Sequence, residues 1–191
     1  MKLLYLPAFL ISVLTVKGQT DNWRTGSVVL RNDQVLTGDI LLHLDFNTVV
    51  LKSHDQLSVL NTQKVRSFRF YDPAVDVNRQ FLTVRNKDEK ESAFYELVVQ
   101  GEFKLVRRLE RHHDINPDDR NDFKYFIMDN QNLTPLRKFK KNILPMLITS
   151  VPQLKDWIDK EHLNLNEGKS AVLIIKEYNN LVRSANLLAS N

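Results

Sequence analysis

The stretch Val65-Arg66-Ser67-Phe68-Arg69-Phe70-Tyr71 decides the fold of this chain. Small or aromatic residues alternate in it with arginines or a serine. That period of two is typical of a β-strand with one face toward water, because successive side chains of a strand point to opposite faces. The stretch therefore predicts a strand, and the residues around it indicate the sheet to which that strand belongs.

Short runs of β-branched and aromatic residues surround this strand from Thr25 to about Met128. They cover residues 27–30, 35–42, 48–52, 57–60, 65–71, 80–85, 93–100, 103–109 and 123–128. Gly38 lies inside one run, where a glycine indicates a bend or bulge, and Gln100-Gly101-Glu102 predicts a tight hairpin turn. Runs separated by turn residues predict an antiparallel sheet of about eight or nine strands over residues 19–134, as a small barrel or a meander.

The hydrophobic period becomes helical after Pro135, which predicts a helical region over residues 135–191. A first apolar stripe, interrupted at Pro145, consists of Phe139, Ile143, Leu144 and Leu147. Ser150 and Asn166 are expected to cap the two helices that follow. Their apolar faces consist of Leu154, Trp157 and Ile158, and of Ala171, Ile174, Ile175, Tyr178, Leu181 and Val182. The expected fold is therefore α+β, with a C-terminal helical hairpin.

Residues 1–18 have the pattern of a signal peptide. Lys2 supplies the positive charge, residues 3–16 carry no charge, and Val16-Lys17-Gly18 suits a cleavage site. The apolar run is too short for a transmembrane helix, which needs roughly 20 residues. We expect a mature chain that begins near Gln19, has no membrane span, and is exported to the periplasm or the extracellular space.

The composition excludes several chemistries. Lys2 and Lys17 lie in the expected leader, so part of the net charge of +4 would be removed with it. The remaining balance gives no argument for nucleic-acid binding. The chain contains no cysteine. Disulfides, thiolate nucleophiles, cysteine-ligated zinc and cysteine-linked lipid are therefore excluded.

A loop after residue 110 holds the densest group of possible metal ligands, which consists of His112, His113, Asp114, Asp118, Asp119 and Asp122. Its start imitates a calcium-binding loop. However, Asp119 stands where such a loop needs glycine, and Tyr125 stands where it needs a bidentate glutamate. Arg111 and Arg120 would also neutralise the carboxylates. We therefore expect a solvated loop, with no metal site and no cofactor.

Ser53-His54-Asp55 contains the residue types of a catalytic triad in adjacent positions. Because neighbouring side chains of a strand point to opposite faces, Ser53 and His54 are not expected to share a proton. His43 and Asp45 could share a face, but such an isolated pair is usually part of the surface. The sequence contains no nucleophile elbow, zinc-protease motif or glycine-rich phosphate loop. No catalytic residue is predicted.

Two basic clusters could bind phosphate or a polyanion. They are Arg107, Arg108 and Arg111, and Arg137, Lys138, Lys140 and Lys141. Acidic residues lie beside the first cluster, and the second begins a helix whose apolar face supplies the packing. A solvated surface is therefore expected at both clusters.

Three segments of the first half have a characteristic order: Val28-Val29-Leu30-Arg31-Asn32-Asp33, Leu36-Thr37-Gly38-Asp39-Ile40 and Asp45-Phe46-Asn47-Thr48-Val49-Val50-Leu51. They resemble the first strand, the bent second strand and the acidic turn of an Sm-like or SH3-like small barrel. The Arg-Gly element of the Sm RNA site is missing, since Asn61-Thr62-Gln63-Lys64 stands in its place. The resemblance implies a small barrel, and RNA binding is not carried over.

Features over most of the chain are Trp23 followed by Gly26-Ser27-Val28-Val29-Leu30, the stretch 65–72, and Ile174-Ile175-Lys176-Glu177-Tyr178-Asn179-Asn180-Leu181. With these features the chain resembles a group of uncharacterised small exported β-rich proteins of Gram-negative bacteria. The resemblance implies export and a helical tail, and it supplies no catalytic residues. We expect a non-catalytic binding or structural module of the cell envelope. The alternatives are a hydrolase with an unrecognised acid/base site and an envelope polyanion-binding protein. The C-terminal helices either pack on the β domain or bind another envelope protein.

Overall fold

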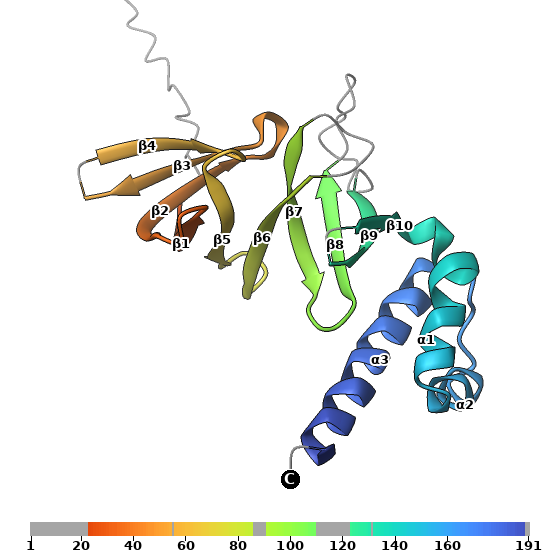
Figure 1. The fold of residues 1–191 in the computed structure, drawn as a ribbon. Helices are drawn as coiled ribbons and strands as arrows, with labels where there is room; N and C mark the ends of the chain where they lie inside the picture. Colours follow the sequence, from red (N-terminus) through yellow and green to blue (C-terminus); the bar gives the residue numbers. More distant parts are fainter. Residues whose placement is uncertain (1–22, 55, 86–90, 110–122, 131, 190–191) are drawn as a thin grey trace, which may run out of the picture.

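The computed structural model of this chain describes residues 23–54, 56–85, 91–109, 123–130 and 132–189 (Figure 1). The expected leader and the expected mature start at Gln19 lie outside these residues. Strands form the first part of the described chain and helices the second, so the predicted α+β fold class is confirmed.

Ten antiparallel strands form one sheet in the described part of the chain. They are β1 (Arg24–Leu30), β2 (Val35–His43), β3 (Thr48–Ser53), β4 (Gln56–Asn61), β5 (Val65–Asp72), β6 (Val77–Arg85), β7 (Ser92–Val99), β8 (Lys104–Leu109), β9 (Phe123–Asp129) and β10 (Asn132–Pro135). Their order across the sheet is β10-β9-β8-β7-β6-β5-β1-β2-β3-β4. Nine strands match the predicted runs. β10 was not predicted, because its four residues, of which the last is proline, are too few to show the hydrophobic period of a strand.

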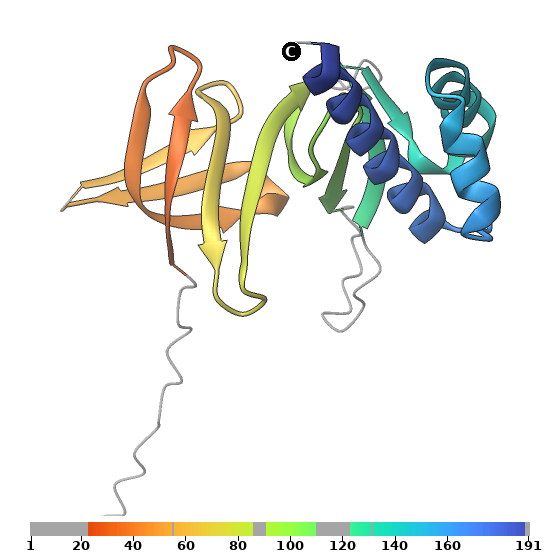
Figure 2. The ribbon, with the colours of Figure 1, turned by 90° about the horizontal axis from the view of Figure 1, so that it is seen from below.

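The sheet is not closed, although its first five strands curl strongly. Figure 2 shows β3 and β4 crossing behind β1 and β2. The residues enclosed by this curl, here called the barrel-end cluster, are Val28, Ile40, Val49, Leu51, Leu60, Val65, Phe68, Phe70, Phe81 and Phe94. The sheet is therefore neither a closed barrel nor a plain meander, because β5 pairs with β1 rather than with β4.

The strand that decides the fold, β5, lies between β6 and β1. From Phe68 to Tyr71 its side chains alternate between buried and exposed, as predicted. The rings of Phe68 and Phe81 stack at 4.7 Å, and Phe94 meets Phe68 edge-on at 5.0 Å. Val65 is buried out of phase, because the register with β1 shifts at that end of the strand.

Gly38 allows a close approach of strands rather than a bulge. It lies opposite Gly26, and the pairing of β2 with β1 and β3 runs without a shift in register. A Cβ at Gly38 would lie 2.2 Å from the carbonyl oxygen of Lys52. Of the predicted bend or bulge, the bulge is absent from the strand pairing. The glycine is needed because any side chain would collide with β3.

The chain after β10 is helical. It forms the 3-10 turn η2 (Leu136–Lys138), the π-helical turn η3 (Phe139–Ile143), α1 (Leu144–Ser150), α2 (Gln153–Lys160) and α3 (Gly168–Ala189). A further 3-10 turn, η1 (Leu44–Phe46), joins β2 to β3. Pro145 lies in the first turn of α1, where its missing N–H costs nothing.

These helices pack on one end of the sheet, where α3 lies across the strands (Figure 2). Val99, Leu105 and Ile127 of the strands share a buried cluster with the helical residues. The helical members of this helix-end cluster are Phe139, Ile143, Leu144, Leu147, Leu154, Ile158, Ala171, Ile174, Ile175 and Tyr178. Of the two predicted arrangements for the helices, the structure therefore has packing on the β domain.

Both predicted helix caps were wrong. Ser150 is the last residue of α1, and its Oγ lies 3.2 Å from the hydroxyl of Tyr178. Asn166 lies two residues before α3, and its side-chain oxygen accepts a hydrogen bond from Lys140. Each of these side chains instead contacts a residue that is distant in the sequence, and the local pattern gives no sign of such a contact.

No helix in the described ranges is both long enough and apolar enough to cross a bilayer.

Candidate functional site

Some of the candidate residues from the sequence cannot be placed. The possible metal ligands His112, His113, Asp114, Asp118, Asp119 and Asp122 lie outside the described residues, as do Asp55 and Arg111. The expected lack of a metal site and of a cofactor therefore stays a prediction.

Ser53 and His54 lie closer together than their positions in the sequence suggest. Ser53 Oγ and His54 Nδ1 are 3.4 Å apart. His54 follows β3 with a φ of 54°, so its side chain does not alternate with Ser53 as it would within a strand. The prediction that Ser53 and His54 point to opposite faces was therefore wrong. His43 at the end of β2 and Asp45 in η1 are both exposed.

The two basic clusters have different surroundings. Arg137, Lys138, Lys140 and Lys141 lie on η2 and η3, and the three lysines and Arg137 reach the surface. Arg107 and Arg108 instead lie on β8 and contact aromatic side chains. The Arg107 guanidinium lies 4.4 Å from the ring centre of Phe123, and Arg108 donates to the hydroxyl of Tyr95.

An ionic row crosses the sheet from β1 to β8 and consists of Arg24, Asp72, Arg79, Glu96 and Arg107. Arg79 links the two acids, since its Nη1 lies 3.2 Å from Asp72 Oδ2 and its Nη2 lies 2.7 Å from Glu96 Oε2. Arg24 Nη2 lies 3.2 Å from Asp72, and Arg107 Nε donates to Glu96 at 2.7 Å. Positive and negative groups therefore alternate along the row.

The ionic row separates the two apolar clusters on one face of the sheet. Glu96 lies two positions after Phe94, which belongs to the barrel-end cluster. Arg107, directly opposite Glu96, lies two positions after Leu105 of the helix-end cluster. Residues two apart on a strand share a face, so polar contacts replace apolar packing where the two clusters approach each other.

The acids of the ionic row are ionised at neutral pH. Burial raises the pKa of Glu96, but hydrogen bonds and charge from Arg79 and Arg107 outweigh it and leave the pKa below its usual value. Burial also raises the pKa of Asp72. The hydrogen bond from Arg79 and the charge of Arg24 outweigh burial and leave the pKa below its usual value. Acid–base catalysts have pKa values near the working pH, so this row suits permanent charge rather than proton transfer.

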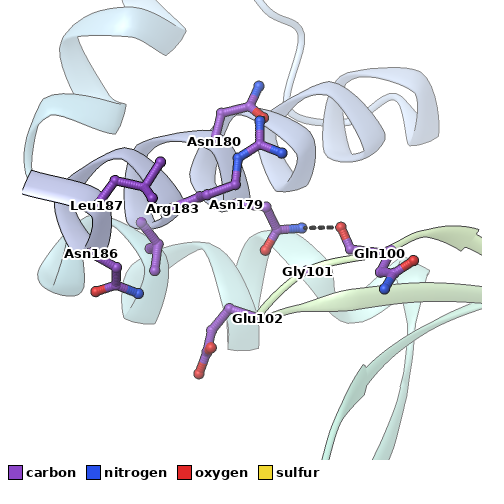
Figure 3. Close-up of a pocket in the computed structure, with 9 residues that line it drawn as sticks. Gln100, Gly101, Glu102, Asn179, Asn180, Arg183, Asn186 and Leu187 are labelled. Carbon is purple, nitrogen blue, oxygen red and sulfur yellow. Dashed lines mark hydrogen bonds between the residues drawn. The ribbon is translucent and has the colours of Figure 1, made fainter. Parts of the chain in front are cut away.

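A pocket of about 700 Å³ opens between the β7–β8 turn and the second half of α3 (Figure 3). This hairpin pocket is lined by Gln100, Gly101, Glu102, Asn179, Asn180, Val182, Arg183, Asn186 and Leu187. Its walls contain four side-chain amides, one carboxylate, one guanidinium and two aliphatic side chains. Amides donate and accept hydrogen bonds equally, so the pocket suits a ligand with both kinds of group.

Asn179 holds the two walls of the hairpin pocket together. Its Oδ1 accepts from the Phe103 backbone N–H at 3.1 Å, and its Nδ2 donates to the Phe103 carbonyl at 2.9 Å. Nδ2 also lies 3.5 Å from the Gln100 carbonyl, as Figure 3 shows. A Cβ at Gly101 would lie 2.2 Å from Asn179 Cγ, so any side chain there would displace the Asn179 amide from the turn. The predicted hairpin turn is confirmed. Its glycine leaves the space that the Asn179 side chain occupies.

Sequence reasoning singled out neither Glu96 nor the hairpin pocket. A signal for Glu96 exists: one acid interrupts the apolar strand β7, and buried acids are almost always paired. No comparable signal exists for Asn179, because asparagine on a helix most often faces water.

Comparison of this chain with protein-family models, with curated proteins and with solved structures found no match.

Proposed function

We propose that this chain is a non-catalytic binding module of the bacterial cell envelope, and that the hairpin pocket binds a segment of another envelope protein. The leader-like residues 1–18 support export, and the mature chain should then begin near Gln19. The observation that carries the proposal is the pocket itself, which is open, mixed in polarity and fixed by Asn179.

The chemistry of the hairpin pocket favours a protein ligand. Backbone groups of a partner match the side-chain amide of Asn180, whose Oδ1 also accepts from Arg183 at 3.3 Å. Glu102 and Arg183 provide one charge of each sign. Leu187, which is 62% exposed, adds apolar area to the wall of the pocket. Polar groups around a few apolar contacts are the usual composition of a protein–protein interface.

The alternative, a hydrolase, has one observation in its favour: the contact between Ser53 and His54. Both side chains lie at the exposed tip of the β3–β4 hairpin. Catalytic nucleophiles need a concave site that excludes water, so a tip is a poor place for one. The other alternative, a polyanion binder, loses Arg107, which is paired with Glu96, and keeps the exposed basic cluster on η2 and η3.

Capture from envelope extract tests the proposed binding. Immobilised mature chain should retain a specific envelope protein, identified by mass spectrometry. Leu187→Ser should reduce the retained amount by about tenfold or more, as loss of an interface hot spot does.

Leu173→Ser is the matched control, because it removes an exposed leucine from the first half of the same helix. It should leave retention unchanged. If the two variants retain equal amounts of the same protein, the partner does not bind at the hairpin pocket.

A further inference from the structure

β4 forms one edge of the sheet, far along the strand order from the hairpin pocket. Its pairing with β3 runs without a shift from Thr48 opposite Asn61 to Ser53 opposite Gln56. Figure 1 shows the β3–β4 hairpin projecting from the body of the protein, with β4 at its margin. Among the described strands only β3 pairs with β4, so alternate backbone N–H and C=O groups of β4 point away from the sheet.

β4 lacks the features by which proteins protect an edge strand from pairing. Its sequence, Gln56-Leu57-Ser58-Val59-Leu60-Asn61, contains no charged residue, proline or glycine. The opposite edge strand, β10, ends at Pro135, which has no N–H to donate. The two edges therefore differ, and β4 is the one suited to pairing.

The outer face of β4 is also apolar. Leu57 is 66% exposed and Val59 is 65% exposed. Val59 lies opposite Val50 of β3, and Val50 lies opposite Leu41 of β2. A strand added beside β4 would extend this apolar row and remove part of it from water.

We propose that the strand added at this edge is β4 of a second copy of the chain, in antiparallel pairing about a two-fold axis at Ser58. Positions at equal distance from the axis then face each other. Leu57 of one copy lies opposite Val59 of the other, on the same face of a joined sheet. Because β4 carries no charge, the pairing brings no like charges together.

A second copy fits this edge better than a charged peptide does, since β4 offers no charge for such a peptide to match. An interface built on one six-residue strand is expected to bury less than the roughly 1,200–2,000 Å² of a standard stable complex, so the dimer should be reversible. The proposal is independent of the hairpin pocket, which β7, β8 and α3 form.

Sedimentation velocity of the mature chain, from about 10 µM to about 1 mM, tests the dimer. The wild-type chain should change from monomer to dimer as its concentration rises. Val59→Lys should remain monomeric, because it places a charge opposite Leu57 of the other copy. The control Val35→Lys makes the same change at a 58% exposed valine of β2, away from the edge, and should dimerise as the wild type does.

Mixing two variants tests the register. Val59→Lys and Leu57→Glu should each be monomeric, yet their mixture should dimerise, because the introduced lysine of one chain then lies opposite the introduced glutamate of the other. Circular dichroism should show that both variants are folded, since both of the replaced side chains are exposed. A wild-type chain that stays monomeric to about 1 mM, a dimer that Val59→Lys does not weaken, or a mixture that stays monomeric would each overturn the proposal.

Discussion

Replacing Ile174 with alanine is expected to lower the free energy of unfolding by about 2–5 kcal/mol, the cost of removing a large aliphatic side chain from a core. Ile174 is fully buried on α3, in the cluster that also contains Leu105 and Ile127 of the sheet. The loss should appear as one shifted transition in urea, monitored both by tryptophan fluorescence and by far-ultraviolet circular dichroism. A single transition follows because helices and strands share that core.

Leu173→Ala is the matched control for this prediction. Leu173 is the neighbour of Ile174 on α3 but is 47% exposed, so its truncation should change stability by no more than about 0.5 kcal/mol. If both variants unfold like the wild type, the helices are not part of the core. Trp157, which the sequence pattern places on the apolar face of a helix, is only partly buried and packs at the margin of the cluster, so it is the poorer probe.

Replacing Glu96 with glutamine is expected to cost about 3 kcal/mol, at the lower end of the range for breaking a buried ion pair. The Glu96 side chain is 10% exposed and binds both Arg79 and Arg107. Glutamine keeps the shape but leaves two arginines without their shared carboxylate. The lower end of the range applies because the arginines keep partial contact with water, at 22% and 27% exposure.

The cost of Glu96→Gln should depend on pH. Because the folded state lowers the pKa of Glu96, the carboxylate stabilises the fold above the pKa of an unfolded glutamate. That stabilisation is lost as the pH falls below about 4 and passes through the lower folded pKa. Urea unfolding from neutral to acidic pH should therefore show the wild type and Glu96→Gln converging. Glu161→Gln, at an exposed position, should follow the wild-type curve throughout. A difference in unfolding free energy between the wild type and Glu96→Gln that stays constant with pH would contradict this account.

Several strands could be predicted from the sequence because one face is wet. β5 shows this best, since Phe68 and Phe70 alternate with exposed Arg69 and Tyr71. By contrast, β7, which is buried on both faces from Ala93 to Glu96, was predicted as a short apolar run between turns. The apolar stripe of α3 could be predicted equally well, because Ala171, Ile174 and Tyr178 recur at spacings of three and four, and all three are buried. Such patterns indicate which side chains are buried, and this information is contained in a short stretch of sequence.

The candidate site could not be predicted, because its residues act across long separations in the chain. Asn179 binds the backbone of Phe103, and Arg79 and Arg107 reach Glu96 from two other strands. Ser150 was misread for the same reason: a serine before a helical pattern suggests a cap, whereas a tertiary contact with Tyr178 takes its hydroxyl. Local rules fail where a polar side chain has a distant partner.

Photo-crosslinking in the native host tests the central claim, that the hairpin pocket binds an envelope protein. A photoreactive amino acid placed at position 187 lies at the pocket, whereas the same residue at position 173 lies on the first half of α3. We predict a discrete adduct of higher mass, recovered from the envelope fraction, for position 187 and none for position 173. No adduct from position 187, or the same adducts from both positions, would contradict the claim.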